Sequence, residues 1–166
     1  MNLYDNQKFW VGRVEQAKLS SPHAAVFRVT NEEWRRIVKG RVDIIKKLTS
    51  PKDKIIDFGC AYGWLSQEIP NPYVGIDQTE ALVHYGRELY PGIEIVQKEM
   101  QNKLPFEDNS FDFVVSSCVK YGIVECEDLG EMPKGRWQKI EEEMMRLAPV
   151  AIIWPSYGPE YEVIKR

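Results

Sequence analysis

Short apolar runs alternate with helix-like segments along most of the chain, and this alternation restricts the possible folds more than any other feature. The apolar runs occupy residues 55–58, 73–77, 93–96, 111–116 and 150–154. Apolar residues at three- and four-residue spacing predict helices over 31–48, 79–89 and 137–147, with a short helix from about residue 64 to before Pro70. Short strands separated by helices are typical of parallel βαβ units whose sheet is buried on both faces. We therefore expect an α/β fold with an open, doubly wound, mostly parallel sheet.

The chain of 166 residues has the length of one domain with a sizeable core. We treat 1–166 as a single domain, with an irregular N-terminal segment over 1–30 and an α/β core over 31–166. The core helix begins at a capping box formed by Thr30 and Glu33.

The strand order expected for such a sheet is 3-2-1-4-5, with a reduced C-terminal end. The run 150–154 then lies at an edge, where unpaired backbone groups invite association. We expect the tail 157–166 to fold back over this edge as a short antiparallel strand. Pairing of two copies across the edge is the alternative, so the chain is predicted to be a monomer or a homodimer.

Composition and charge exclude several classes of protein. A net charge of −3 and the lack of a long run of Lys and Arg make nucleic acid an unlikely partner. No stretch reaches the roughly 20 apolar residues of a membrane span, and the N-terminus has no signal-peptide core, so we expect a cytoplasmic protein without a membrane partner. The three cysteines lack metal-ligand spacing and there are only two histidines, so no metal site is expected.

A ligand on a doubly wound sheet binds beyond the carboxyl ends of the strands, beside the first strand. The first such loop, DFGCAYGW over residues 57–64, has small residues at 59, 61 and 63, which allow backbone to approach a ligand closely. A dinucleotide-binding fingerprint would have a third glycine where Trp64 stands. Asp57 would also add negative charge beside a pyrophosphate. A nicotinamide-dependent oxidoreductase therefore fits less well than a protein whose ligand carries an ammonium or a sulfonium group.

The second and third strands end in further polar residues. Asp77 follows Gly59 by 18 residues, a position from which a carboxylate can accept hydrogen bonds from both hydroxyls of a ribose. An ordinary surface aspartate at a strand end is the alternative. Glu99 and Met100 follow the third strand, and LPFEDNSFD over 104–112 precedes the fourth.

Taken together, DFGCAYG, VGID and LPFEDNSFDFVVSS resemble the class I S-adenosylmethionine-dependent methyltransferases, and most closely the type-11 branch. The resemblance extends over roughly residues 50–155 and implies a Rossmann-like methyltransferase fold with S-adenosylmethionine as the cofactor. It assigns Asp77 to the ribose and Gln78 to the adenine. The other residues that it places around the cofactor are Asp57, Gly59, Cys60, Ala61, Gly63 and Trp64 in the first loop, Glu99 and Met100 at the adenine, and Ser116 and Ser117 near the reactive methyl group.

The chain departs from the family pattern in two places. Ala61 replaces the middle glycine of the loop, and only residues 161–164 offer a strand beyond the fifth, so the elements that bind a methyl acceptor are reduced. We expect a methyltransferase acting on a small-molecule acceptor, and the alternative is a catalytically silent module that binds the cofactor or a protein partner. Acceptor contacts are expected from the N-terminal segment and residues 118–135. The catalytic residues remain unassigned, with His23, Lys120 and Tyr121 as candidates.

Overall fold

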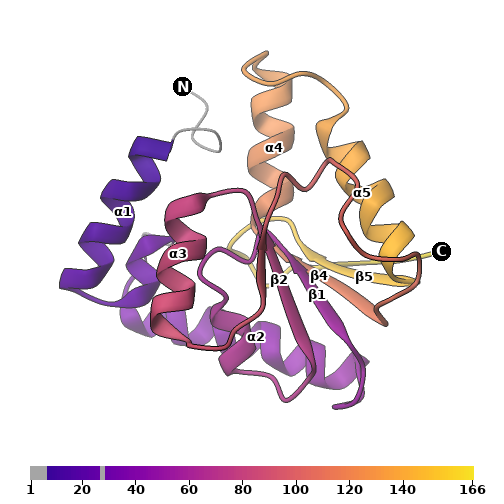
Figure 1. Cartoon of the computed structure of the whole chain (residues 1–166), viewed down its shortest axis with the longest axis horizontal. Coiled ribbons are helices and arrows are strands. Elements are labelled where there is room, and N and C mark those ends of the chain that lie inside the picture. The colour runs from indigo at the N-terminus through magenta and orange to yellow at the C-terminus, as the bar shows by residue number, and fades with distance from the viewer. Residues whose placement is uncertain (1–6, 27–28) are drawn as a thin grey trace.

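The computed structural model describes residues 7–26 and 29–166. Its centre is a six-stranded sheet in the order β3-β2-β1-β4-β5-β6, in which the first five strands are parallel and β6 is antiparallel to β5 (Figure 1). The strands are β1 Ile55–Phe58, β2 Tyr73–Asp77, β3 Ile95–Gln97, β4 Phe113–Ser117, β5 Val150–Trp154 and β6 Glu162–Lys165. The expected fold class is confirmed.

Helices cover both faces of the sheet. They are α1 Gln7–Leu19, α2 Asn31–Leu48, α3 Glu80–Leu89, α4 Val119–Asp128 and α5 Arg136–Leu147, with short 3₁₀ helices at Pro22–Ala25 and Trp64–Gln67. On one face, Ile55 and Ile152 pack with α1, α2 and α3. On the other face, Ile56 and Ile153 pack with α4 and α5. The strands are therefore apolar throughout because successive side chains enter two different cores.

The N-terminal segment was predicted to be irregular, and the structure corrects this prediction. It contains α1 and the 3₁₀ helix Pro22–Ala25, and α1 packs against α3 with an ion pair of 3.7 Å between Lys18 Nζ and Glu88 Oε2. Only Val14 and Ala17 of α1 are fully buried. Two buried residues are too few to form an apolar stripe, so the sequence pattern did not indicate this helix. A helix of this kind is stabilised by tertiary packing rather than by an amphipathic pattern.

The tail folds back on the sheet edge as expected. β6 pairs with β5 in a register that joins Val150 to Lys165 and Ile153 to Glu162. Ile164 packs against the core beneath α5. The outermost parallel strand is therefore covered within one copy of the chain.

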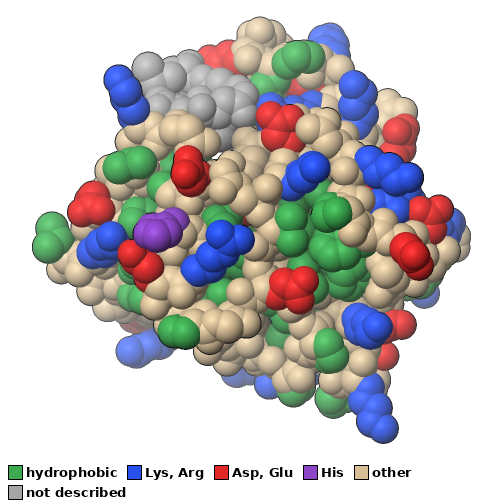
Figure 2. Space-filling model, viewed as in Figure 1, with side chains coloured by type: hydrophobic (Ala, Val, Ile, Leu, Met, Phe, Trp, Pro, Cys, Tyr) green, Lys and Arg blue, Asp and Glu red, His purple; other side chains and the backbone are tan. Residues whose placement is uncertain are grey.

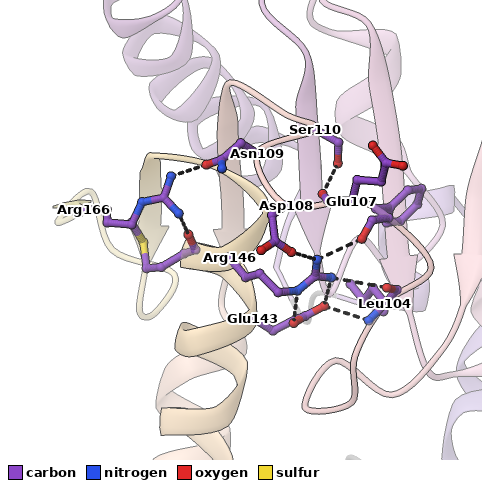
Figure 3. Close-up of polar contacts among 10 residues, drawn as sticks. Leu104, Glu107, Asp108, Asn109, Ser110, Glu143, Arg146 and Arg166 are labelled. Atoms are coloured by element: carbon purple, nitrogen blue, oxygen red, sulfur yellow. Dashed lines mark hydrogen bonds and ion pairs between the residues drawn. The ribbon is translucent and has the colours of Figure 1, made fainter.

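The LPFEDNSFD segment is fastened to α5 rather than to a ligand site (Figure 3). Arg146 binds both carboxylate oxygens of Glu143, at 2.8 and 2.6 Å, and donates to the Phe106 carbonyl at 2.9 Å and to Asp108 at 2.7 Å. Glu143 also accepts the backbone N–H of Leu104 at 2.7 Å. This network fixes the connection between β3 and β4, so the LPFEDNSFD motif has a structural role in holding that connection to α5.

The surface shows charged side chains of both signs around a central group of hydrophobic ones on the face drawn in Figure 2. Over the part of the chain that the structure describes, no helix is both long and apolar enough to cross a membrane. The same residues contain no group of three or more His, Cys, Asp or Glu side chains that is arranged to hold a metal ion.

Candidate functional site

A cavity lies at the carboxyl ends of β1, β2 and β4, where the topology of the sheet predicts a ligand. It measures about 670 Å³, open solvent at its mouth included. Segments from the loops after β1, β2, β3 and β4, and from the N-terminal helical region, meet around it. Its wall consists of Trp10, Val26, Gly59, Ala61, Trp64, Asp77, Gln78, Thr79, Leu82, Met100, Ser117, Cys118, Val119 and Tyr157.

The loop after β1 brings backbone to the cavity wall. Gly59 and Ala61 both have left-handed backbone, with φ of 75° and 54°. A Cβ at Gly59 would overlap the side chain of Val119, so no larger residue fits there without movement. Ala61 keeps a conformation that is uncommon for a residue with a side chain because its N–H donates to Asp77 at 2.8 Å.

Asp77 joins this loop to the start of α3. One carboxylate oxygen accepts the Ala61 N–H and the other accepts the Thr79 N–H, each at 2.8 Å. The side chain is buried, and burial raises its pKa above the ordinary value despite hydrogen bonds with the Thr79, Ala61 and Gln78 backbone and with the Thr79 side chain. Asp77 therefore shapes the cavity, and its oxygens are the acceptors that a ligand hydroxyl in the cavity would share.

Asp57 lies behind the loop and not in the cavity wall. Its carboxyl group is 3% exposed and accepts a hydrogen bond of 2.8 Å from the Tyr73 hydroxyl. Burial raises the pKa of Asp57 to about 7, and the nearby Asp77 adds to the shift. Asp57 thus joins β1 to Tyr73 of β2 through a carboxyl group that titrates near neutrality.

The structure brings many of the predicted cofactor residues together, namely Gly59, Ala61, Trp64, Asp77, Gln78, Met100 and Ser117. The others lie outside the wall. Ser116 is buried and donates to the Phe58 carbonyl at 3.0 Å. The Glu99 side chain accepts hydrogen bonds from the side-chain amides of Gln101 and Asn102. Cys60 is buried beside Gly75, and a Cβ at Gly63 would contact the Ile93 side chain. Their contacts with the cofactor remain predictions.

The three candidate catalytic residues are not in the cavity wall. His23 is buried and stacks on Trp34 at 5.4 Å between ring centroids, and burial lowers its pKa. Lys120 pairs with Glu162 at 2.6 Å and lies over the Trp137 ring. Tyr121 is 59% exposed. These positions favour structural or surface roles.

Four wall residues come from the two segments that were expected from the sequence to contact an acceptor. Trp10 and Val26 lie in the N-terminal segment, and Cys118 and Val119 lie directly after β4. None of these four was assigned to the cofactor from the sequence, although the rule for strand ends could have found Cys118 and Val119. The buried Trp10 Nε1 has no hydrogen-bond partner among the described residues, which leaves one N–H donor for a ligand.

Comparison with known proteins identifies the class. Residues 55–138 match the family model of the methyltransferase domain, and the chain belongs to this family. S-adenosylmethionine is the cofactor that membership implies. The cavity fits it, because Gly59 allows backbone to approach a ligand closely, and the buried carboxylate of Asp77 and the rings of Trp10 and Trp64 line the same space.

Solved structures share the fold at low sequence identity. The PH0226 protein of Pyrococcus horikoshii is 20% identical, with a TM-score of 0.63 over 84% of this chain and 60% of that one. A TehB-like SAM-dependent methyltransferase of Corynebacterium glutamicum is 19% identical, with a TM-score of 0.54 over 74% of this chain and 68% of that one. A SAM-dependent methyltransferase of Aquifex aeolicus is 21% identical, with a TM-score of 0.53 over 86% of this chain and 70% of that one. The chain thus spans 60–70% of these structures. No curated protein sequence matches it significantly.

Proposed function

We propose that this chain is an S-adenosylmethionine-dependent methyltransferase acting on a small-molecule acceptor. The observation that carries the proposal is that Gly59, Asp77 and Met100, which were expected from the sequence to hold the cofactor, line one and the same cavity. A cytoplasmic location and action as a monomer, with β6 covering the sheet edge, belong to the same proposal.

The bound cofactor supplies a methyl group on a sulfonium, whose leaving group needs no activation by the protein. The chain's own contribution is then to hold and align the reactants and to exclude water, and alignment alone is worth several powers of ten in rate. Loop backbone at Gly59 and Ala61 allows close approach, and Asp77 offers acceptors for hydroxyl groups. Trp10, Trp64 and Leu82 give the cavity an apolar lining.

A catalytically silent cofactor-binding module is the second candidate. One observation favours it: the cavity wall, over the described residues, contains no histidine or lysine. A general base is needed only for a weakly acidic nucleophile, so its absence from the wall does not by itself decide between the two candidates. Both candidates bind the cofactor at the same site, and they differ in whether the methyl group is transferred.

Calorimetric titration with S-adenosylmethionine, S-adenosylhomocysteine and NAD tests the site. We expect the first two to bind and NAD not to bind. Gly59→Val should abolish binding because the new side chain enters the space of Val119. Gly130→Val is the matched control, since Gly130 is also left-handed but a Cβ there meets no atom within 4 Å. Normal binding by a folded Gly59→Val protein would contradict the cofactor site.

Transfer of radiolabelled methyl groups separates the two candidates. The protein is incubated with labelled S-adenosylmethionine and a metabolite extract, and labelled products are separated by size and polarity. A labelled small molecule that is absent with Gly59→Val supports the enzyme. Tight cofactor binding without labelled product supports the silent module.

A further inference from the structure

A second hollow opens beside the cofactor cavity, along α2 and the connection between β5 and β6. We call it the α2 groove. It measures about 1250 Å³, open solvent included, and its wall is mainly apolar, with Ile37, Ile44, Trp154 and Pro159 among its residues. Tyr157 lines both the α2 groove and the cofactor cavity. The two spaces are therefore neighbours.

Arg41 in the wall of the α2 groove is a buried cation. The residue is 2% exposed, and its Nη2 donates to Cys118 Sγ at 3.3 Å and to the Ser156 carbonyl at 3.1 Å. Cys118 lies in the wall of the cofactor cavity, so Arg41 stands between the two spaces. Its guanidinium carbon lies 5.8 Å from the centre of the Trp154 ring.

The charge of Arg41 is not neutralised by a neighbouring carboxylate. Among the described residues, no acid lies within ion-pair distance of it, and its Nε has no hydrogen-bond partner. Asp57 acts on it only through space, Cys118 is its hydrogen-bond acceptor, and burial lowers the pKa of Arg41. A buried charge without a partner is costly, and such groups are usually paired. The groove thus offers a cation and a free N–H donor to an anion.

The other charged side chains around the groove favour an anion with a single charge. Glu33, Arg36 and Asp43 also line it, and the charge of Arg36 acts on Glu33. Glu33 is engaged with Thr30 at the N-terminus of α2, and Asp43 pairs with Lys39. The two carboxylates outnumber Arg36, so they repel a dianion such as a phosphate monoester more strongly than a carboxylate. A planar carboxylate also matches the fork of a guanidinium.

We propose that the α2 groove binds the methyl acceptor, and that this acceptor is an apolar molecule carrying one carboxylate, which Arg41 holds. That the ligand is a methyl acceptor rests on the proposed function. That it is an apolar carboxylate rests on the groove alone. The apolar body lies against Ile37, Ile44 and Trp154, and its nucleophilic end lies beside Tyr157, which lines both the α2 groove and the cofactor cavity. There the nucleophile would form a bond to the methyl carbon as the bond from that carbon to the sulfonium sulfur breaks, with S-adenosylhomocysteine as the leaving group.

The test compares carboxylates with neutral amides of the same shape. Benzoate, phenylacetate and octanoate are titrated by calorimetry against the full chain, with and without S-adenosylhomocysteine, beside benzamide, phenylacetamide and octanamide. A charge-assisted pair is worth enough for the best carboxylate to bind about tenfold or more tightly than its amide. The inference is overturned if no carboxylate binds more tightly than its amide.

Two sets of variants locate the preference. Arg41→Met keeps the bulk and removes the charge, and we expect it to bind acid and amide alike. Gly40 also lines the groove, and a Cβ there meets no atom within 4 Å. Gly40→Glu adds a carboxylate and should weaken acid binding relative to Gly40→Gln, which adds the same shape without charge. A preference that survives in both Arg41→Met and Gly40→Glu contradicts the proposal.

Failure of the two proposals can be told apart. S-adenosylhomocysteine affinity is measured for every variant and reports the cofactor cavity. If the wild type does not bind this nucleoside, the proposed function fails, while the carboxylate preference is still decided by the titrations without it. If Arg41→Met does not fold, the Gly40→Glu and Gly40→Gln pair decides the question.

Discussion

At the scale of single residues, Asp77 does two jobs with one carboxylate. It holds the backbone of Ala61 and Thr79, and it lines the cavity. We expect Asp77→Asn to weaken S-adenosylhomocysteine binding by about 1–3 kcal/mol, because one oxygen is replaced by a donor and an N–H or a ligand hydroxyl loses its acceptor. Calorimetry measures the effect. Asp128→Asn, an equal change at an exposed position at the end of α4, should bind as the wild type does. Unchanged affinity in Asp77→Asn would contradict the assignment.

Asp57 predicts how stability depends on pH. Its pKa of about 7 in the folded chain lies above the ordinary value of 3.8, so the folded chain keeps a proton that the unfolded chain releases. The favourable contribution is complete below the ordinary pKa and is lost as the pH rises toward 7, because stability falls wherever the native state binds more protons. Asp57→Asn cannot titrate, so its stability should fall less between about pH 5 and pH 8. Urea denaturation of both proteins measures this, and parallel pH curves would refute the assignment.

The sequence predicted residues of the cavity wall best where they lie at the end of a strand. Asp77 ends β2, Gln78 follows it directly, and both lie in the cavity wall. Glu99 follows β3 by two residues, and its side chain turns to Gln101 and Asn102 instead. The rule for strand ends finds a position along the chain, but the direction of a side chain in a turn depends on local hydrogen bonds that the sequence does not specify.

At the scale of elements, the packing of α3 on the cofactor loop depends on Gly86. A Cβ there would lie 2.5 Å from the carbonyl oxygen of Tyr62. Gly86→Ala should therefore destabilise the fold by about 1–3 kcal/mol through overpacking, although alanine favours a helix. Gly12→Ala is the matched control in α1, where a Cβ meets no atom within 4 Å and up to about 1 kcal/mol of stabilisation is expected. Urea denaturation compares the two, and a Gly86→Ala protein as stable as the wild type would contradict this account.

The sequence predicts the elements with strong periodicity and misses those without it. The helix α2 has the capping box of Thr30 and Glu33 that was expected, with a hydrogen bond of 3.2 Å from the Glu33 N–H to the Thr30 hydroxyl. α1 and α4 were not predicted, since α1 has two fully buried residues and α4 has Val119 and Ile123. These helices contribute Trp10 and Val119 to the cavity wall, so this part of the wall could not be predicted from helical periodicity.

At the scale of the whole molecule, the order of the strands explains why the site lies where it does. The chain reverses direction across the sheet between β1 and β4, and the loops after these strands separate to leave the cavity. This placement was predictable from alternation alone. The α2 groove was not, because it depends on how the connection between β5 and β6 passes over α2.

The strand β6 provides the last prediction, because it covers the edge of β5 that would otherwise be exposed. Deleting residues 158–166 removes the partner of β5 and should lower the melting temperature or cause aggregation, since an apolar edge strand invites pairing with another chain. A smaller change on the same strand separates packing from pairing. Ile164 packs against the core, whereas Val163 is 40% exposed, so Ile164→Ser should destabilise more than Val163→Ser. Thermal denaturation and size-exclusion chromatography measure both effects. A truncated protein that stays monomeric with an unchanged melting temperature would show that β5 needs no cover.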